Sequence, residues 1–231
     1  MLRTESTELK SPPHASAASK EALIPISVIY LIGKRGLDIF GALFGLILAL
    51  PLFLVLRILY CFGENKGPLL FRQQRYGRNG RLFWIYKFRS MVVNAEEYLK
   101  QNPALYRWYV ENNYKLEPEE DPRITKLGKF LRRTSLDEIP QLINVLMGDM
   151  SLVGPRPVVE EELKEYKHKK QEFLSVKPGM TGYWQVCGRS SVGYPERVAV
   201  ELHYVYNQSL LLDIKILFLT ILVVLSKKGA Y

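Results

Sequence analysis

The most apolar stretch of the chain is Ile39-Phe-Gly-Ala-Leu-Phe-Gly-Leu-Ile-Leu-Ala-Leu-Pro-Leu-Phe-Leu-Val-Leu56. As a helix with a rise of about 1.5 Å per residue, it would extend roughly 27 Å, barely the hydrocarbon thickness of a bilayer. Pro51 lies inside it, and a proline in a helix interior removes a hydrogen bond and bends the helix. The stretch predicts a membrane-associated helix that bends near Pro51.

Basic residues flank this stretch on both sides. Because basic flanks tend to stay in the cytoplasm, both ends of the helix are predicted to face the same compartment. Two arrangements stay equally open from the residues alone: a re-entrant helix that breaks near Pro51 and returns, and a transmembrane helix kinked there. A buried core helix is a weaker third, since the stretch has no polar face. The flanking cations are Lys34 and Arg35 before it and Arg57, Lys66, Arg72, Arg75 and Arg78 after it.

The charge balance narrows the class of partners. The 231 residues include 32 Lys and Arg against 23 Asp and Glu, which gives a formal net charge of +9. Such an excess favours nucleic acid, an anionic membrane surface or a phosphorylated substrate. The chain contains no recognised nucleic-acid-binding module, so no nucleic-acid partner is predicted. Cys61 and Cys187 lack the spacing of a metal site.

The remaining chain alternates helical and extended patterns. Residues 1–21 predict a flexible tail, and residues 22–32 predict a short apolar segment at the membrane interface or against the core. Asn79-Gly80 favours a turn between two strands. The expected elements are strands at 68–71 and 82–86, a helical stretch at 94–115 broken at Pro103, a basic amphipathic helix at 123–133, a helix at 160–173, a strand at 183–186, a helix at 194–208 and an apolar interfacial or core segment at 210–225.

Two adjacent carboxylates occur in Arg132-Arg-Thr-Ser-Leu-Asp-Glu-Ile-Pro-Gln141, just before an apolar run. Ser135 and Glu138 have the S-x-x-E spacing of a capping box, which predicts Asp137 and Glu138 in the first turn of a helix. The free amides and the positive dipole end there would keep Asp137 ionised and attract a phosphate. An anionic Asp beside a phosphate indicates a nucleophile. For an isolated motif, simple capping is the commoner explanation.

The loop Gly154-Pro-Arg-Pro157 supplies a second candidate group. Proline on both sides of Arg156 fixes the backbone, and the planar guanidinium suits a phosphate. Lys87 and Arg89 lie on or beside the predicted hairpin, where they form either a solvated basic face or a contact to anionic lipid headgroups.

These motifs resemble those of the bacterial sugar transferases, the monotopic polyprenyl-phosphate phosphoglycosyl transferases. The resemblance covers about residues 33–231, and so many long blocks in one order are specific. The closing segment 226–231 resembles the exopolysaccharide-initiating branch that uses hexoses. The blocks are Lys34-Arg35-x-x-Asp38, Arg75-x-Gly77, Tyr86-Lys-Phe-Arg-Ser-Met91, Asp121-Pro-Arg-Ile-Thr125, Thr134-Ser-Leu-Asp-Glu-Ile-Pro-Gln141, Gly148-Asp-Met-Ser-Leu-Val-Gly-Pro-Arg-Pro157 and Lys177-Pro-Gly-Met-Thr-Gly-Tyr-Trp-Gln-Val186.

The resemblance implies an α+β, mostly helical fold with a re-entrant helix over 36–62 and a small β-hairpin or sheet. It divides the chain into a flexible tail with a short apolar segment (1–33), a re-entrant membrane helix (34–62) and a cytosolic catalytic domain with interfacial amphipathic helices (63–231). The several N-terminal spanning helices of larger members are not expected here. The implied location is the bacterial inner membrane, with the catalytic domain on the cytoplasmic face.

The resemblance also implies a reaction: a hexose 1-phosphate moves from a UDP-sugar, with galactose or glucose favoured, to polyprenyl phosphate. It implies a catalytic pair of Asp137 and Glu138, a covalent phospho-sugar on Asp137, and Mg²⁺ held partly by Glu138. A homodimer is compatible with the family. The expected contacts to phosphate or lipid headgroups are Lys87, Arg89, Arg123, Arg132, Arg133 and Arg156.

A non-enzymatic, membrane-anchored adaptor is the strongest alternative. A basic face that binds lipid or a partner would explain the charge and the apolar helix. It would require neither the adjacent carboxylates nor an arginine held between prolines.

Overall fold

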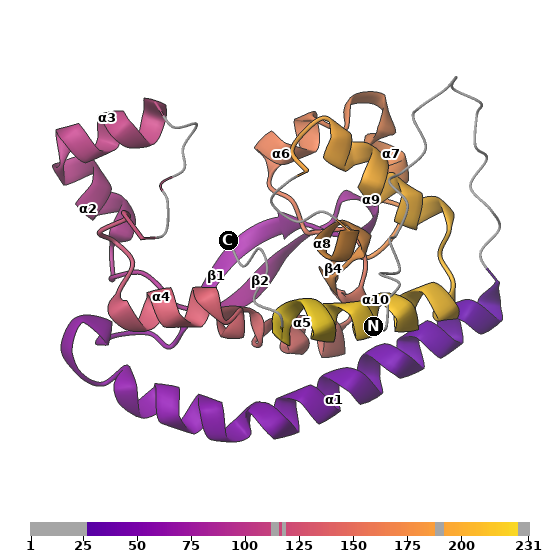
Figure 1. The fold of residues 1–231 in the computed structure, drawn as a ribbon, viewed down its shortest axis with the longest axis horizontal. Coiled ribbons are helices and arrows are strands. Elements are labelled where there is room, and N and C mark those ends of the chain that lie inside the picture. The colour runs from indigo at the N-terminus through magenta and orange to yellow at the C-terminus, as the bar shows by residue number, and fades with distance from the viewer. Residues whose placement is uncertain (1–26, 112–115, 117–118, 188–191, 226–231) are drawn as a thin grey trace, which may run out of the picture.

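The computed structural model describes residues 27–111, 116, 119–187 and 192–225. The predicted tail over 1–21 and the closing segment 226–231 lie outside the described residues. Helices make up most of the described chain, and the strands form two small two-stranded sheets. The prediction of a mostly helical α+β fold with a long apolar helix near the N-terminus is therefore confirmed (Figure 1).

The helices and strands follow one another in a simple order. Short 3₁₀ turns lie at Gly63–Asn65, Arg78–Gly80, Leu136–Glu138 and Lys167–Lys169. The regular elements are α1 (Val28–Leu59), β1 (Leu70–Tyr76), β2 (Leu82–Phe88), α2 (Ala95–Gln101), α3 (Pro103–Glu111), α4 (Lys126–Arg133), α5 (Gln141–Met147), β3 (Ser151–Val153), α6 (Glu160–Lys164), α7 (Lys170–Phe173), β4 (Gly179–Thr181), α8 (Tyr183–Cys187), α9 (Glu196–Tyr206) and α10 (Leu210–Leu225).

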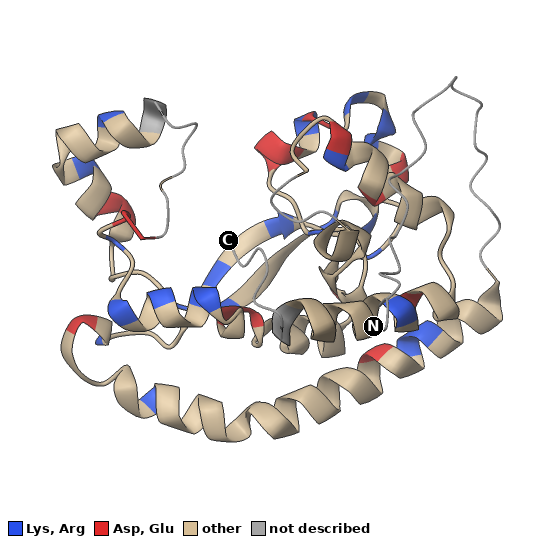
Figure 2. Cartoon of the chain, in the orientation of Figure 1, with Lys and Arg blue, Asp and Glu red and all other residues tan. Residues whose placement is uncertain are grey.

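The long helix α1 has 32 residues and continues through Pro51, so the break expected there is not present. It begins at Val28, earlier than expected, because the side chain of Ser27 accepts a hydrogen bond from the N–H of Ile29 and caps the helix. Within the described ranges it is the one helix long and apolar enough to cross a membrane. Figure 2 shows a long part of α1 without charged residues. In the sequence this part lies between Asp38 and Arg57, and most apolar side chains of α1 are exposed. These features indicate membrane association.

Charged residues at the start of α1 attach it to the rest of the molecule. The Nζ of Lys34 donates to the carbonyl of Val153 at 3.0 Å and to the buried carboxylate of Asp213, on α10, at 2.9 Å. The guanidinium of Arg35 donates to the carbonyls of Val145 and Leu146 at 2.7 and 2.8 Å. Those carbonyls belong to the last turn of α5, where backbone acceptors lack helical partners.

Asp38 completes this attachment. Its Oδ1 accepts hydrogen bonds from the hydroxyl of Ser151 and the N–H of Leu152, both at 2.8 Å. The opposite end of α1 packs elsewhere on the same domain, where Leu56 and Tyr60 form a buried cluster with Phe88 and other apolar residues. Both ends of the apolar helix therefore contact a single folded unit.

The β1–β2 hairpin places charged side chains next to the core. The strands pair antiparallel, with Leu70 opposite Phe88 and Tyr76 opposite Leu82, and both run longer than predicted. Since side chains alternate across a strand, Phe83, Ile85 and Lys87 share one face. Phe83 and Ile85 are buried in a cluster with residues of α5, so Lys87 is held at the border of this core.

Three sequence-based expectations differ from the structure. Residues 183–186 form helix α8, and the strand lies earlier, at β4, which pairs parallel with β3. This pairing brings Gly179 against Gly154 so closely that a Cβ on Gly179 would lie 2.1 Å from a backbone nitrogen. The helix expected at 160–173 is interrupted where Lys167 takes a positive φ of 47°. The helix expected from 123 begins at Lys126, since the Thr125 side chain caps it.

Gly128 in α4 provides a test of the packing. A Cβ at this position would lie 1.9 Å from the carbonyl oxygen of Ser90, which belongs to the backbone. We expect Gly128→Ala to lower the free energy of unfolding by about 1–3 kcal/mol, the usual range for overpacking. Gly36→Ala is the matched control, because nothing lies within 4 Å of the added methyl group. Thermal unfolding in detergent measures both; equal stability of the two variants would contradict the packing described here.

Candidate active site

The two adjacent carboxylates lie in the 3₁₀ turn Leu136–Glu138 between α4 and α5. The predicted capping box is wrong, because Ser135 has a left-handed backbone with φ of 56° and its side chain makes no cap hydrogen bond. Helix α5 begins only at Gln141, with Pro140 as the preceding residue. Asp137 and Glu138 therefore precede the helix instead of occupying its first turn.

Asp137 is buried, with 8% of its surface exposed. Burial raises the pKa of its carboxyl from 3.8 to about 6, and the charge of Glu138 adds to this, while Lys87 and Arg132 act in the opposite direction. The expectation that the local helix dipole keeps Asp137 firmly ionised therefore needs correction, since its pKa is raised. At neutral pH the carboxylate form still predominates.

Glu138 shows the opposite behaviour. Its Oε1 lies 2.6 Å from the Nζ of Lys87, on β2. Burial alone would raise its pKa, but the charges of Lys87 and Arg156 and hydrogen bonds from Lys87 and Gln141 outweigh burial and lower the pKa. Neighbouring carboxylates with opposite pKa shifts are typical of sites in which two acids have separate roles.

A pocket opens beside Glu138, with an empty volume of about 280 Å³ including solvent at its mouth. Three of its lining residues are cations and one is an anion, so the lining has a formal charge of +2. Such a pocket favours a polyanionic ligand. The lining residues are Arg75, Ile85, Lys87, Glu138, Gln141, Arg156, Pro157, Gly179, Met180 and Gln185.

Comparison with known proteins identifies the family. The profile of the family described as "Bacterial sugar transferase" matches residues 29–227. The chain belongs to the bacterial sugar transferase family. An exopolysaccharide production protein ExoY from Sinorhizobium fredii is 44% identical over 204 residues, which cover 87% of this chain and 88% of that protein.

Two further relatives are longer than this chain. An undecaprenyl-phosphate galactose phosphotransferase of Salmonella typhimurium is 50% identical over 201 residues, or 86% of this chain and 41% of that protein. A UDP-glucose:undecaprenyl-phosphate glucose-1-phosphate transferase of Escherichia coli is 38% identical over 215 residues, or 90% of this chain and 43% of that protein. The chain thus spans less than half the length of these two relatives.

The pocket of this bacterial sugar transferase contains some of the predicted site residues and not others. Lys87 and Arg156 line it together with Glu138. Arg132 lies close enough to lower the pKa of Asp137, and its Nε donates to the hydroxyl of Ser90 at 2.8 Å. Arg133 is exposed on α4 and does not line the pocket.

Arg89 and Arg123 occupy other surroundings. Arg89 is buried and donates to the carbonyls of Asn65, Pro68 and Met91. Arg123 is buried and binds the carboxylate of Asp121 through Nε and NH2 at 2.8 and 2.7 Å. Both guanidinium groups bind other groups of the protein. Contact of Arg89 or Arg123 with a substrate therefore stays a prediction.

Sequence reasoning missed Arg75 and Gln141 as pocket residues. Arg75 shares one face of the hairpin with Lys87, and the Arg75-x-Gly77 motif together with strand alternation could have placed it there. No sequence pattern indicated Gln141 as a pocket residue. Its position depends on the 3₁₀ turn Leu136–Glu138, which is present where the sequence predicted the first turn of a helix.

The carboxylates fit a divalent cation that is shared with a substrate. Among the described residues, no three His, Cys, Asp or Glu side chains gather in a metal-binding arrangement. Mg²⁺, however, is usually held by one or two carboxylates together with substrate phosphates and water. Glu138 at the pocket, with Asp137 next to it, supplies that kind of donor set.

The buried charge of Asp137 predicts an effect on stability. A pKa raised from 3.8 to about 6 means that folding is disfavoured where this group is ionised, by up to about 3 kcal/mol above pH 6. The penalty declines as pH falls below 6 and vanishes below 3.8, where the group is protonated in both states. We therefore expect Asp137→Asn to raise the melting temperature at pH 7.5 and to lose this advantage near pH 4.

Glu120→Gln is the control for this measurement, since Glu120 is exposed. Glu120→Gln should leave the difference in melting temperature between pH 7.5 and pH 4 the same as in the wild type. A melting temperature of Asp137→Asn at or below that of the wild type at pH 7.5 would contradict the raised pKa.

Proposed function

We propose that this protein transfers a hexose 1-phosphate from a UDP-hexose to undecaprenyl phosphate, releases UMP and so starts exopolysaccharide assembly. The observation that carries the proposal is the pair of adjacent carboxylates with opposite pKa shifts beside a cationic pocket. The names of the relatives support it. Galactose is the first candidate sugar and glucose the second, because identity to the galactose-named Salmonella protein is higher.

The reaction proceeds in two displacements. An oxygen of the Asp137 carboxylate attacks the β-phosphorus of the donor, the bond to the bridging oxygen breaks, and UMP leaves. A phosphate oxygen of the polyprenyl carrier then attacks the same phosphorus, and the carboxylate departs. The products are polyprenyl diphosphate-hexose and the free enzyme, so the kinetics are ping-pong.

The pocket cations fit the charge that this reaction develops. An anion that attacks a diphosphate meets electrostatic repulsion, which fixed positive groups offset. Lys87 and Arg156 are the candidates, and both lower the pKa of Glu138 in the same pocket. Mg²⁺, when held by Glu138 and substrate phosphates, supplies further positive charge.

The proposed location is the cytoplasmic face of the bacterial inner membrane, with α1 as a re-entrant helix. The support is that both ends of α1 contact the same folded domain, through Lys34, Arg35 and Asp38 at one end and Leu56 and Tyr60 at the other. A helix that crossed straight through a bilayer would separate these contacts. The homodimer remains a prediction from the family resemblance.

A covalent intermediate is the most direct test. Incubation with UDP-galactose or UDP-glucose alone should add the mass of one hexose phosphate to the wild-type protein and release one UMP. Asp137→Asn should show neither, because an amide is a poor nucleophile of nearly the same shape. Intact-protein mass spectrometry measures the adduct. A fully active Asp137→Asn enzyme, or kinetics that require a ternary complex, would rule out the mechanism.

The same labelling reaction has a predicted pH dependence. Since the carboxylate form attacks, the rate constant for labelling should rise with pH through about 6 and level off above neutrality. Donor alone is used because the acceptor phosphate itself titrates near pH 6. A rate that falls as pH rises through this range would contradict the assignment. The adaptor alternative predicts no labelling at any pH.

Glu138→Gln tests the metal role separately. If Glu138 holds Mg²⁺, its loss should raise the Mg²⁺ concentration needed for half-maximal UMP release by about 10-fold or more. Glu97→Gln, at an exposed position on α2, is the control. An unchanged metal titration would leave Glu138 with its ion pair to Lys87 as its only role.

A further inference from the structure

We propose that Arg75 contacts a substrate phosphate in the pocket and that Glu162 is the positioning residue that orients its guanidinium. This inference rests on the proposed function, because it names a further residue for the same site. It extends the phosphate-binding group beyond Lys87 and Arg156.

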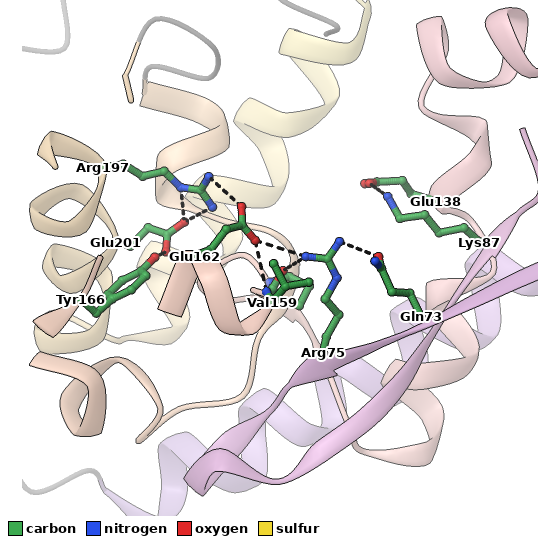
Figure 3. Close-up of polar contacts among 10 residues, drawn as sticks. Gln73, Arg75, Lys87, Glu138, Val159, Glu162, Tyr166, Arg197 and Glu201 are labelled. Carbon is green, nitrogen blue, oxygen red and sulfur yellow. Dashed lines mark hydrogen bonds and ion pairs between the residues drawn. The ribbon is translucent and has the colours of Figure 1, made fainter. Parts of the chain in front are cut away.

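Arg75 lies on β1 and lines the pocket together with Lys87, Arg156 and Glu138. Figure 3 shows its contacts to Glu162 and Gln73. Its side chain is 16% exposed. Its Nη1 donates to Glu162 Oε2 at 3.2 Å, and its Nη2 donates to Gln73 Oε1 at 2.8 Å. The buried Nε has no hydrogen-bond partner among the described residues. A guanidinium that lines a cationic pocket and is held by Glu162 and Gln73 is suited to an incoming anion.

Several contacts from different elements fix Glu162. Its Oε2 accepts a hydrogen bond from the backbone N–H of Val159 at 3.2 Å, at the start of α6. Its Oε1 lies 4.0 Å from NH1 of Arg197, on α9. The carboxylate therefore has little freedom, and it presents Oε2 to Arg75 from a fixed position.

Arg197 is itself held firmly. Its NH2 donates to the buried carboxylate of Glu201 at 3.0 Å, and its guanidinium lies 4.0 Å from the centre of the Trp184 ring. Figure 3 shows the chain of contacts from Glu201 through Arg197 and Glu162 to Arg75. This series of contacts connects buried residues of α9 to the rim of the pocket. Because side chains held in this way lose little freedom on binding, the arrangement favours affinity for a ligand.

The proposed ligand of Arg75 is a phosphate group, and both substrates, the UDP-hexose and polyprenyl phosphate, contain one. The donor has a diphosphate, and the acceptor has a terminal phosphate. In ping-pong kinetics, kcat/KM for each substrate reports its own half-reaction, so the two sources can be separated. Binding of UDP at equilibrium gives a measurement that needs no turnover.

The main experiment compares Arg75→Ala, Arg75→Lys and Arg72→Ala in the full chain. We expect Arg75→Ala to lower kcat/KM for the donor, the acceptor or both by about 10-fold or more, since charge-assisted hydrogen bonds are the strong ones. Arg75→Lys should recover part of the loss. Arg72 is the control, because it lies on the same strand but is exposed, with its guanidinium 5.1 Å from the Trp84 ring centre.

Glu162→Gln tests the positioning role. Glutamine retains an acceptor for Arg75 but removes the charge, so KM should rise severalfold while kcat and the melting temperature change little. Glu161→Gln, at an exposed neighbouring position on α6, should be unaffected. A fall in melting temperature with an unchanged KM would show that Glu162 only supports the fold and would overturn its positioning role.

The results also separate this inference from the proposed function. One outcome is that the wild-type enzyme forms the hexose phosphate adduct and catalyses the full reaction while Arg75→Ala keeps wild-type kcat/KM for both substrates. In that case the Arg75 proposal is overturned and the proposed function stands. If the wild type forms no adduct, the proposed function fails. Arg75 is then judged by UDP affinity: a loss of about 10-fold in Arg75→Ala, absent in Arg72→Ala, supports the contact, and equal affinity or no binding overturns it.

Discussion

Three charged side chains at the start of an apolar helix determine much of this architecture. Lys34, Arg35 and Asp38 lie next to a long uncharged surface, where an unpaired charge would be expensive. Each is satisfied by backbone groups of α5 or β3, which adjoin residues that line the pocket. Arg35 holds the end of α5, and Lys34 and Asp38 hold β3. Because the carboxylate turn precedes α5 and the Gly-Pro-Arg-Pro loop follows β3, these contacts connect the membrane helix to the site.

The site itself separates two chemically identical groups by their surroundings. Asp137 is buried with incomplete compensation, while Glu138 is paired with Lys87. The first arrangement disfavours folding, and the second stabilises an anion at the pocket. A protein that tolerates such a penalty at one carboxylate retains a group that is more basic than an exposed aspartate, which suits a nucleophile at neutral pH.

Much of the architecture was accessible from the sequence, since it depends on local patterns. Hydrophobic composition predicted α1, strand propensity and Asn79-Gly80 predicted the hairpin, and Pro103 correctly divided α2 from α3. The turn at Asp137 differs from the expected helix start, because Ser135 takes a left-handed conformation that its S-x-x-E spacing does not indicate. β4 could not be placed either: its strand conformation depends on the contact between Gly154 and Gly179, which are distant in sequence. Lys87 and Arg156, which were predicted to contact phosphate, line the pocket, and that contact stays a prediction. Arg89 instead satisfies backbone carbonyls that no sequence pattern reveals.

Asn144 pairs with backbone groups on the outer edge of β2, which affects how the hairpin can associate with another chain. Its side chain is fully buried, accepts from the N–H of Tyr86 at 3.0 Å and donates to the carbonyl of Trp84 at 2.7 Å, which mimics an adjoining strand. The N–H of Tyr86 and the carbonyl of Trp84 are therefore already paired and do not bind an added strand. A strand added along β2 would first have to displace this buried amide, so Asn144 protects part of the sheet edge against association with another chain.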